Sequence, residues 1–104
     1  MRAAAALAGL ALTACSPQAL ATDVTRAAAR NVVANALGVQ YPSAQSELAA
    51  TCLVQAATDD EAAALARDIG VRPGTVTMDN IRALAARPAA QDCVAARGLP
   101  PVAA

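Results

Sequence analysis

The chain has 104 residues, with eight basic and eight acidic side chains, so its formal charge is zero and it lacks the basic surface that nucleic-acid binding requires. It has no histidine, which removes the commonest general base and metal ligand, and no phenylalanine or tryptophan for a large core. Its alanine, leucine, arginine and glutamate favour helices over sheet, so we expect one small all-α domain.

The first residues have the pattern of a secretory signal. Met1-Arg2 supplies one positive charge, and an apolar run of 12 residues follows over 3–14. That run is shorter than the about 20 apolar residues that a membrane-spanning helix needs. We therefore expect residues 1–14 to be a signal peptide.

Leu12-Thr13-Ala14-Cys15 resembles the lipobox of bacterial lipoproteins. In that family the leader is cut before the cysteine, and the thiol takes a diacylglyceryl group. The resemblance implies that Cys15 is lipidated, that residues 15–22 form a tether, and that the membrane partner is reached through this lipid anchor. It implies a place in the cell envelope facing the periplasm, and Ser16 after the cysteine implies the outer membrane.

A second cleavage site competes with the lipobox. Ala19-Leu20-Ala21 fits the ordinary signal peptidase, which prefers small residues before the cut. Cleavage there would release a soluble periplasmic domain that begins at Thr22 and lacks Cys15.

The first helix of the domain is expected to begin at a cap on Thr22 or Asp23 and to end before Gly38. Arg26 and Arg30 should flank its buried face with their guanidinium groups in water. The buried face is expected to contain Ala29, Val32, Val33, Ala36 and Leu37.

A second helix is expected over 44–57, capped by Ser43 after a turn at Tyr41-Pro42. Tyr41 is the only aromatic residue, and we expect it in the core or at a hinge. The inward positions of this helix are Leu48, Ala49, Cys52, Leu53 and Ala56.

Thr58 and Glu61 have the spacing of a capping box at the start of a third helix that Gly70 closes. Asp59 and Asp60 complete an acidic cluster with Glu61. Consecutive acids do not match the alternating ligands of a calcium loop, whereas they suit the positive end of a helix dipole, so a structural role is expected. The inward positions are Ala62, Leu65, Ala66 and Ile69.

Two further helices are expected beyond a turn at Pro73-Gly74, whose residue order is typical of type II. Thr77 should cap the fourth helix, and Pro88 suits the first position of the fifth, which ends before Gly98. Residues 99–104 should form an irregular tail. The inward positions of these two helices are Met78, Ile81, Leu84, Ala85, Ala90, Cys93 and Val94.

Cys52 and Cys93 remain once Cys15 is assigned to lipid, and an even remainder in an exported protein predicts one disulfide. The bond would close a loop of about 41 residues and stabilise the domain by roughly 4 kcal/mol through the lost entropy of the unfolded chain. A redox role is disfavoured because the two cysteines lack C-x-x-C spacing. The expected fold is a small bundle of four to five short helices over 23–98, stapled by this disulfide.

No catalytic, metal-binding or cofactor-binding residue is expected, because nucleophile motifs, phosphate loops and a set of four zinc ligands are missing from the sequence. The stretch from Asp23 through Cys52 to Cys93-Val94 and Leu99-Pro100 is similar to a group of short alphaproteobacterial lipoproteins of unknown function. We expect a non-enzymatic envelope lipoprotein with a structural or interaction domain. The alternative is an accessory subunit or ligand-binding module of a membrane-bound complex.

Overall fold

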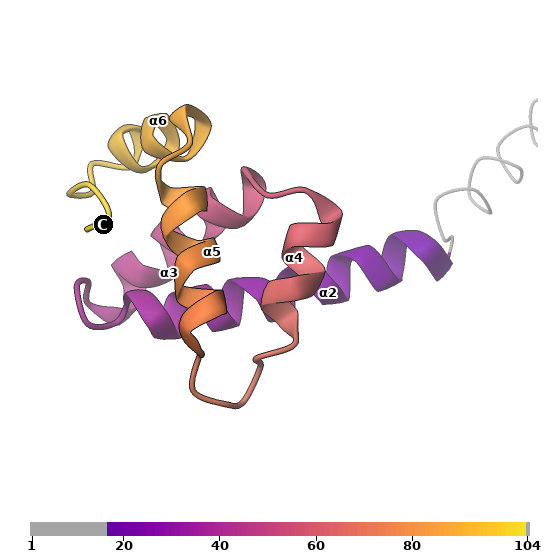
Figure 1. Ribbon diagram of the computed structural model, residues 1–104. Helices are drawn as coiled ribbons and strands as arrows, with labels where there is room; N and C mark the ends of the chain where they lie inside the picture. The colour runs from indigo at the N-terminus through magenta and orange to yellow at the C-terminus, as the bar shows by residue number, and fades with distance from the viewer. Residues whose placement is uncertain (1–16, 104) are drawn as a thin grey trace, which may run out of the picture.

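The computed structural model describes residues 17–103, and all of their regular secondary structure is helical. The helices are α2 (Pro17–Leu37), α3 (Ser43–Gln55), α4 (Asp59–Ala66), α5 (Thr75–Ala85) and α6 (Pro88–Ala96). Helices α3 and α4 both pack along α2, whereas α5 and α6 pack against α3 (Figure 1). The expected all-α class, a small helical bundle with one disulfide, is confirmed.

Helix α2 begins at Pro17, earlier than the expected cap at Thr22 or Asp23. Proline fits the first turn of a helix because the N–H that it lacks would have no partner there. Residues 17–22, which were expected to belong to a tether, are therefore helical. The N-terminal part of α2 extends beyond the other helices (Figure 1).

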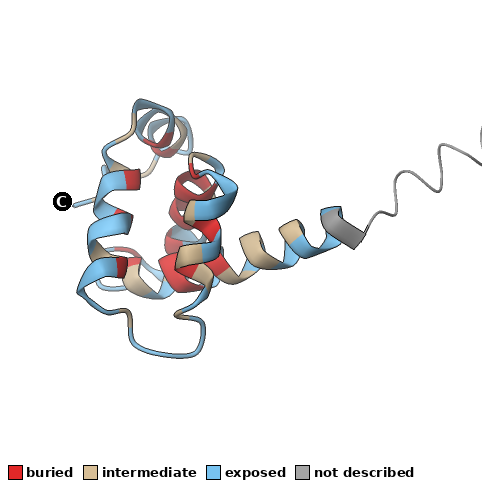
Figure 2. Ribbon diagram, turned by 45° about the vertical axis from the view of Figure 1, so that its right-hand side comes forward, coloured by how far each residue is buried: buried red, intermediate tan, exposed pale blue. Residues whose placement is uncertain are grey.

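The core lies where α2, α3, α4 and α5 meet, and α6 covers one side of it (Figure 2). The expected faces of α2, α5 and α6 are confirmed. In α3, Leu48 is exposed against expectation, whereas Ala50 and Val54, which were not expected to face inward, are buried. The largest fully buried side chains are Leu53, Leu65, Leu84, Val32, Val33, Val54 and Cys52.

Tyr41 is buried between α2 and the C-terminal tail, as expected for a core residue. Its hydroxyl donates to the carbonyl of Pro100 at 2.5 Å, and burial raises the pKa of this hydroxyl. The neighbouring Gln40 side chain donates to the carbonyl of Pro101 and accepts from the amide of Ala103, both at 2.7 Å. The tail is irregular as expected, and these contacts fix it against the turn between α2 and α3.

Two further expected helix caps, those of α3 and α5, are also wrong. The N-cap residue of α3 is Pro42 instead of Ser43. Ser43 is the first residue of the helix, and its carbonyl accepts a hydrogen bond from the Ser46 hydroxyl at 3.0 Å. Helix α5 begins at Thr75 with Gly74 at its N-cap, so Thr77 lies inside the helix instead of capping it.

The connection between α4 and α5 also differs from expectation. Gly74 has a φ of −81°, so the type II turn, which needs a positive φ at that position, does not form. Gly70, with a φ of 78°, follows α4, but the helix has already ended at Ala66, which leaves Ile69 exposed instead of inward.

Candidate functional site

Cys52 of α3 and Cys93 of α6 form the predicted disulfide, with Cα atoms 5.5 Å apart. Cys52 is buried in the core, and Cys93 is half-buried against it. Because the two helices are distant in sequence, the bond ties the last helix to the centre of the domain. Its position inside the core indicates a structural role.

Arg26 reaches from α2 to the end of α3, although we expected its head in water. Its guanidinium donates to the carbonyls of Val54 at 2.8 Å and Ala57 at 3.2 Å, and it pairs with the carboxylate of Asp59 at 2.7 Å. The last carbonyls of a helix have no partner within it and carry its negative dipole end, which a cation neutralises. Arg26 therefore caps α3 and binds the start of α4.

Arg87 approaches the same corner from the turn before α6. Its guanidinium donates to the carbonyl of Ala56 at 2.7 Å and to both carboxylate oxygens of Glu61, at 2.8 and 2.5 Å. Two parallel hydrogen bonds to one carboxylate make this the strongest type of arginine pair. We call residues 54–61, which include these acceptors of Arg26 and Arg87, the α3–α4 corner.

Glu61 takes part in two interactions at this corner. Its Oε1 accepts from the backbone amide of Thr58 at 2.8 Å, while its own amide donates to the Thr58 hydroxyl at 3.2 Å, so the predicted capping box is confirmed. The hydrogen bonds from Arg87 and then from Thr58 lower the pKa of the Glu61 carboxyl to about 2. The same ion pair raises the pKa of Arg87.

Two of the three acids at the start of α4 form ion pairs, each with a different arginine. Asp59 pairs with Arg26, Glu61 pairs with Arg87, and Asp60 is exposed. Within residues 17–103 no three Cys, Asp or Glu side chains are arranged to hold a metal ion. The three acids lie in the first turn of α4, as their sequence pattern predicted.

A cavity of about 420 Å³ lies between α5, α6 and the tail. Most of its wall is aliphatic, and the polar side chains on it are Gln91 and Asp92, both exposed. Among the described residues, no buried side-chain nitrogen or oxygen lacks a hydrogen-bond partner. We call this cavity the apolar groove, and none of the residues that line it pairs a nucleophile with a base.

Cys15, the predicted lipidation site, lies outside the described residues, as do the residues of the predicted signal peptide and of the lipobox-like sequence. The nearest described residue is Pro17, where α2 begins. None of the helices within 17–103 combines the length and the apolar character that a membrane crossing requires.

No known protein family matches the chain, and neither a curated protein nor a solved structure is detectably similar to it.

Proposed function

We propose that this chain is a non-enzymatic lipoprotein of the cell envelope, in which lipidated Cys15 anchors a small helical domain that serves a structural or interaction role. The observation that carries the proposal is the lipobox Leu12-Thr13-Ala14-Cys15, placed two residues before the start of α2. Acyl chains contribute about 0.8 kcal/mol of membrane affinity for each buried CH₂, so several chains on one residue hold a domain of this size firmly.

The disulfide supports export to the periplasm. Disulfides persist in oxidising compartments, and a bond between Cys52 and Cys93 suits the periplasm better than the cytosol. Because these two cysteines bond to each other, Cys15 is the one cysteine left for lipid. Ser16 after it favours the outer membrane.

Labelled palmitate tests the anchor. The wild type should incorporate the label, and Cys15→Ser should not, because serine has no thiol to form the thioether. Ser16→Ala is the matched control, since it changes the neighbouring residue and keeps the thiol. Equal labelling of the wild type and Cys15→Ser would contradict the proposal.

The apolar groove favours a second candidate, an accessory subunit or ligand-binding module of a membrane-bound complex. Its aliphatic wall and its volume of about 420 Å³ suit a partner side chain or a small apolar ligand. A large partner that purifies with the chain in stoichiometric amounts under mild detergent would support this candidate. Repeated purification of the chain alone would count against it.

The same palmitate labelling distinguishes the lipidated protein from the soluble alternative, in which the leader is cleaved after Ala21. Such a cut removes Cys15 and also the first five residues of α2, 17–21. It predicts an unlabelled protein that is released from cells when the outer membrane is opened.

A further inference from the structure

Apart from the isolated Val39 and Leu48, the exposed large apolar side chains of the described chain lie in groups at two places. One is the N-terminal part of α2, and the other runs from the α4–α5 connection into the first turn of α5. Single exposed aliphatic residues are common on protein surfaces, whereas groups of them mark contact sites. The side chains involved are 51 to 74% exposed, and they are Leu20, Val24, Ile69, Val71 and Val76.

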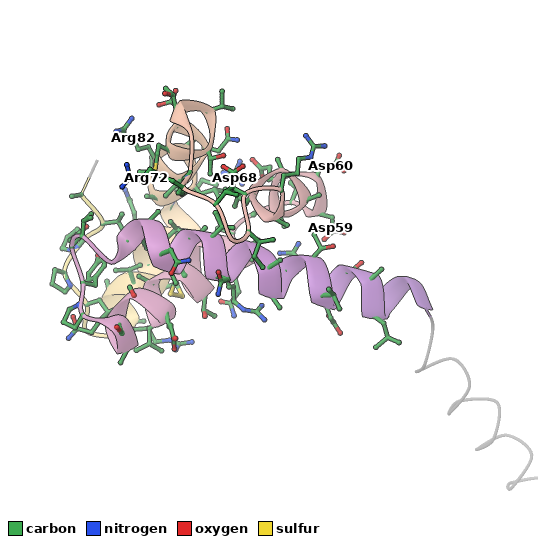
Figure 3. The ribbon with its side chains drawn as sticks, turned by 90° about the horizontal axis from the view of Figure 1, so that it is seen from below. Asp59, Asp60, Asp68, Arg72 and Arg82 are labelled. Atoms are coloured by element: carbon green, nitrogen blue, oxygen red, sulfur yellow. A yellow bond between two sulfur atoms is a disulfide. The ribbon has the colours of Figure 1, made fainter. Side chains whose placement is uncertain are left out.

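Leu20 and Val24 lie on the face of α2 that points away from the core. Leu20 precedes the buried Ala29 by nine residues, and Val24 precedes the buried Val33 by the same interval. Nine residues correspond to about two and a half helical turns, so each pair points in opposite directions. When the molecule is seen from below, no other helix covers α2 (Figure 3), so the side of α2 opposite the core is open there.

The α4–α5 connection projects to the same side. In Figures 1 and 2 the connection and the N-terminal end of α2 form two separate projections, and the rest of the described chain lies on one side of the line that joins them. A flat surface can therefore touch both projections at once. We call the five apolar residues, together with Arg67 and Arg72 beside them, the lower surface.

The charge of the lower surface at the connection is positive. Arg67 and Arg72 are exposed, and neither guanidinium group forms a hydrogen bond or an ion pair with the described residues. The one acid between them, Asp68, accepts a hydrogen bond from the hydroxyl of Thr77 at 2.5 Å. Figure 3 shows Arg72 pointing away from Asp59 and Asp60 of α4.

Unpaired arginines beside exposed aliphatic side chains fit a surface of anionic lipid. The guanidinium group binds phosphate through two hydrogen bonds, and aliphatic side chains enter the boundary between headgroups and acyl chains. Residue 17 also lies only two residues from Cys15, which is at most about 7 Å of extended chain. With Cys15 lipidated as proposed, a bilayer is the surface nearest to the start of α2.

We propose that the lower surface rests on the anionic headgroups of the bilayer in which Cys15 is anchored, so that the domain lies flat on the membrane. The choice of a bilayer over an acidic protein rests on the proposed function, because lipidation of Cys15 places the membrane next to α2. The positive charge of Arg67 and Arg72 makes the contact depend on anionic lipid.

Because the chain has no tryptophan, one introduced tryptophan is a clean probe of membrane contact. Val71→Trp places it on the lower surface, and Val39→Trp is the control, since Val39 is 96% exposed at the opposite end of α2. The lipidated proteins are reconstituted into vesicles of phosphatidylglycerol or of phosphatidylcholine. We expect Val71→Trp emission in phosphatidylglycerol to shift to shorter wavelength and to be quenched by brominated lipid, with no change for Val39→Trp.

Replacing both connection arginines tests the charge. Arg67→Gln with Arg72→Gln should abolish the preference of Val71→Trp for phosphatidylglycerol, whereas Arg97→Gln, an exposed arginine after α6, should keep it. An unchanged Val71→Trp emission in both lipids would overturn the proposal. Crosslinking from position 71 in cells to a protein and not to lipid would overturn it in favour of an acidic partner.

Palmitate labelling of the same samples separates this proposal from the proposed function. A labelled protein whose Val71→Trp emission stays unchanged leaves the anchor intact and defeats the membrane contact. An unlabelled protein whose Val71→Trp emission still shifts in phosphatidylglycerol defeats the anchor and supports the contact.

Discussion

Thr58 and Glu61 bind each other's backbone amides at the start of α4. The sequence predicts this pair because both partners lie within one helical turn. Replacing Thr58 by alanine leaves the Glu61 amide without its acceptor, so Thr58→Ala should lower the free energy of unfolding by about 1 kcal/mol. Urea unfolding followed by circular dichroism measures the change.

Ser43→Ala is the matched control for the cap. Ser43 is also an exposed hydroxyl residue at a helix start, but α3 has no side-chain cap. Its replacement should change the free energy of unfolding by less than about 0.5 kcal/mol. A loss as large as that of Thr58→Ala would contradict the distinction between the two positions.

Because the pKa of Glu61 is lowered in the folded state, we expect the domain to lose stability in acid. This pKa is lowered from 4.5 to about 2 in the folded state by the hydrogen bonds from Arg87 and Thr58. Folding therefore favours the ionised carboxylate, and this stabilisation is present above pH 4.5 and lost as the pH falls toward 2. The difference in melting temperature between the wild type and Glu61→Gln should be full at neutral pH and close to zero near pH 2.

Asp60→Asn serves as the control for Glu61, because Asp60 is an exposed neighbour and its replacement keeps the Arg87 pair. This variant should retain the acid dependence of the wild type. A gap between the wild type and Glu61→Gln that stays constant down to pH 2 would show that the carboxylate charge is not the cause.

The long-range hydrogen bonds of Arg26 and Arg87 could not be predicted from the sequence. The acceptors of Arg26 lie 28 to 33 residues away in the chain, and those of Arg87 lie 26 and 31 residues away. Their pairing depends on how the helices pack, which a local pattern does not contain. The caps expected at Ser43 and Thr77 fail for a local reason, because Pro42 and Gly74 already occupy the N-cap positions.

For whole helices, apolar periodicity predicted which face is buried better than where each helix begins and ends. The buried positions of α5 and α6 match the pattern because a helix must turn one stripe toward the core. The sequence did not predict the start of α2, because Pro17 fits the end of the expected leader as well as it fits the first residue of a helix. Ile69 continues the apolar periodicity of α4 in the sequence, but the helix ends at Ala66, so Ile69 lies in the connection that follows.

The disulfide links α3 to α6 across 41 residues, and its removal should destabilise the domain strongly. Loop-closure entropy predicts a loss of about 4 kcal/mol for Cys52→Ala with Cys93→Ala, close to the whole stability of many small domains. Urea unfolding with and without reductant measures it. Reduced wild type, which keeps both side chains, should lose nearly as much as the double variant, and unchanged stability after complete reduction would contradict the prediction.

Arg26 should stabilise the junction of α2, α3 and α4, because its guanidinium group donates to two backbone carbonyls and pairs with Asp59. Arg26→Ala removes hydrogen bonds from a charged donor, so we expect a loss of about 1 to 3 kcal/mol in the free energy of unfolding. Arg30→Ala is the control, because Arg30 is exposed one turn further along α2. Equal losses in the two variants would show that the carbonyl contacts do not matter.

At the scale of the whole molecule, the sequence predicted the helical class and the disulfide but not the lower surface. That surface combines two apolar residues of α2 with three from the α4–α5 connection and the start of α5, which lie 45 to 56 positions further along the chain. Their placement on one side follows from how α4 packs on α2, and the exposure of Ile69 follows from the early end of α4. The proposed membrane orientation therefore depends on tertiary structure.

We propose that the mature chain begins at lipidated Cys15. Intact-mass and peptide mass spectrometry of the protein from detergent-extracted membranes tests it most directly. We expect a mature N-terminus at Cys15 that carries diacylglyceryl and fatty-acyl mass, with Cys52 and Cys93 becoming alkylated only after reduction. An unmodified mature chain that begins at Thr22 would contradict it.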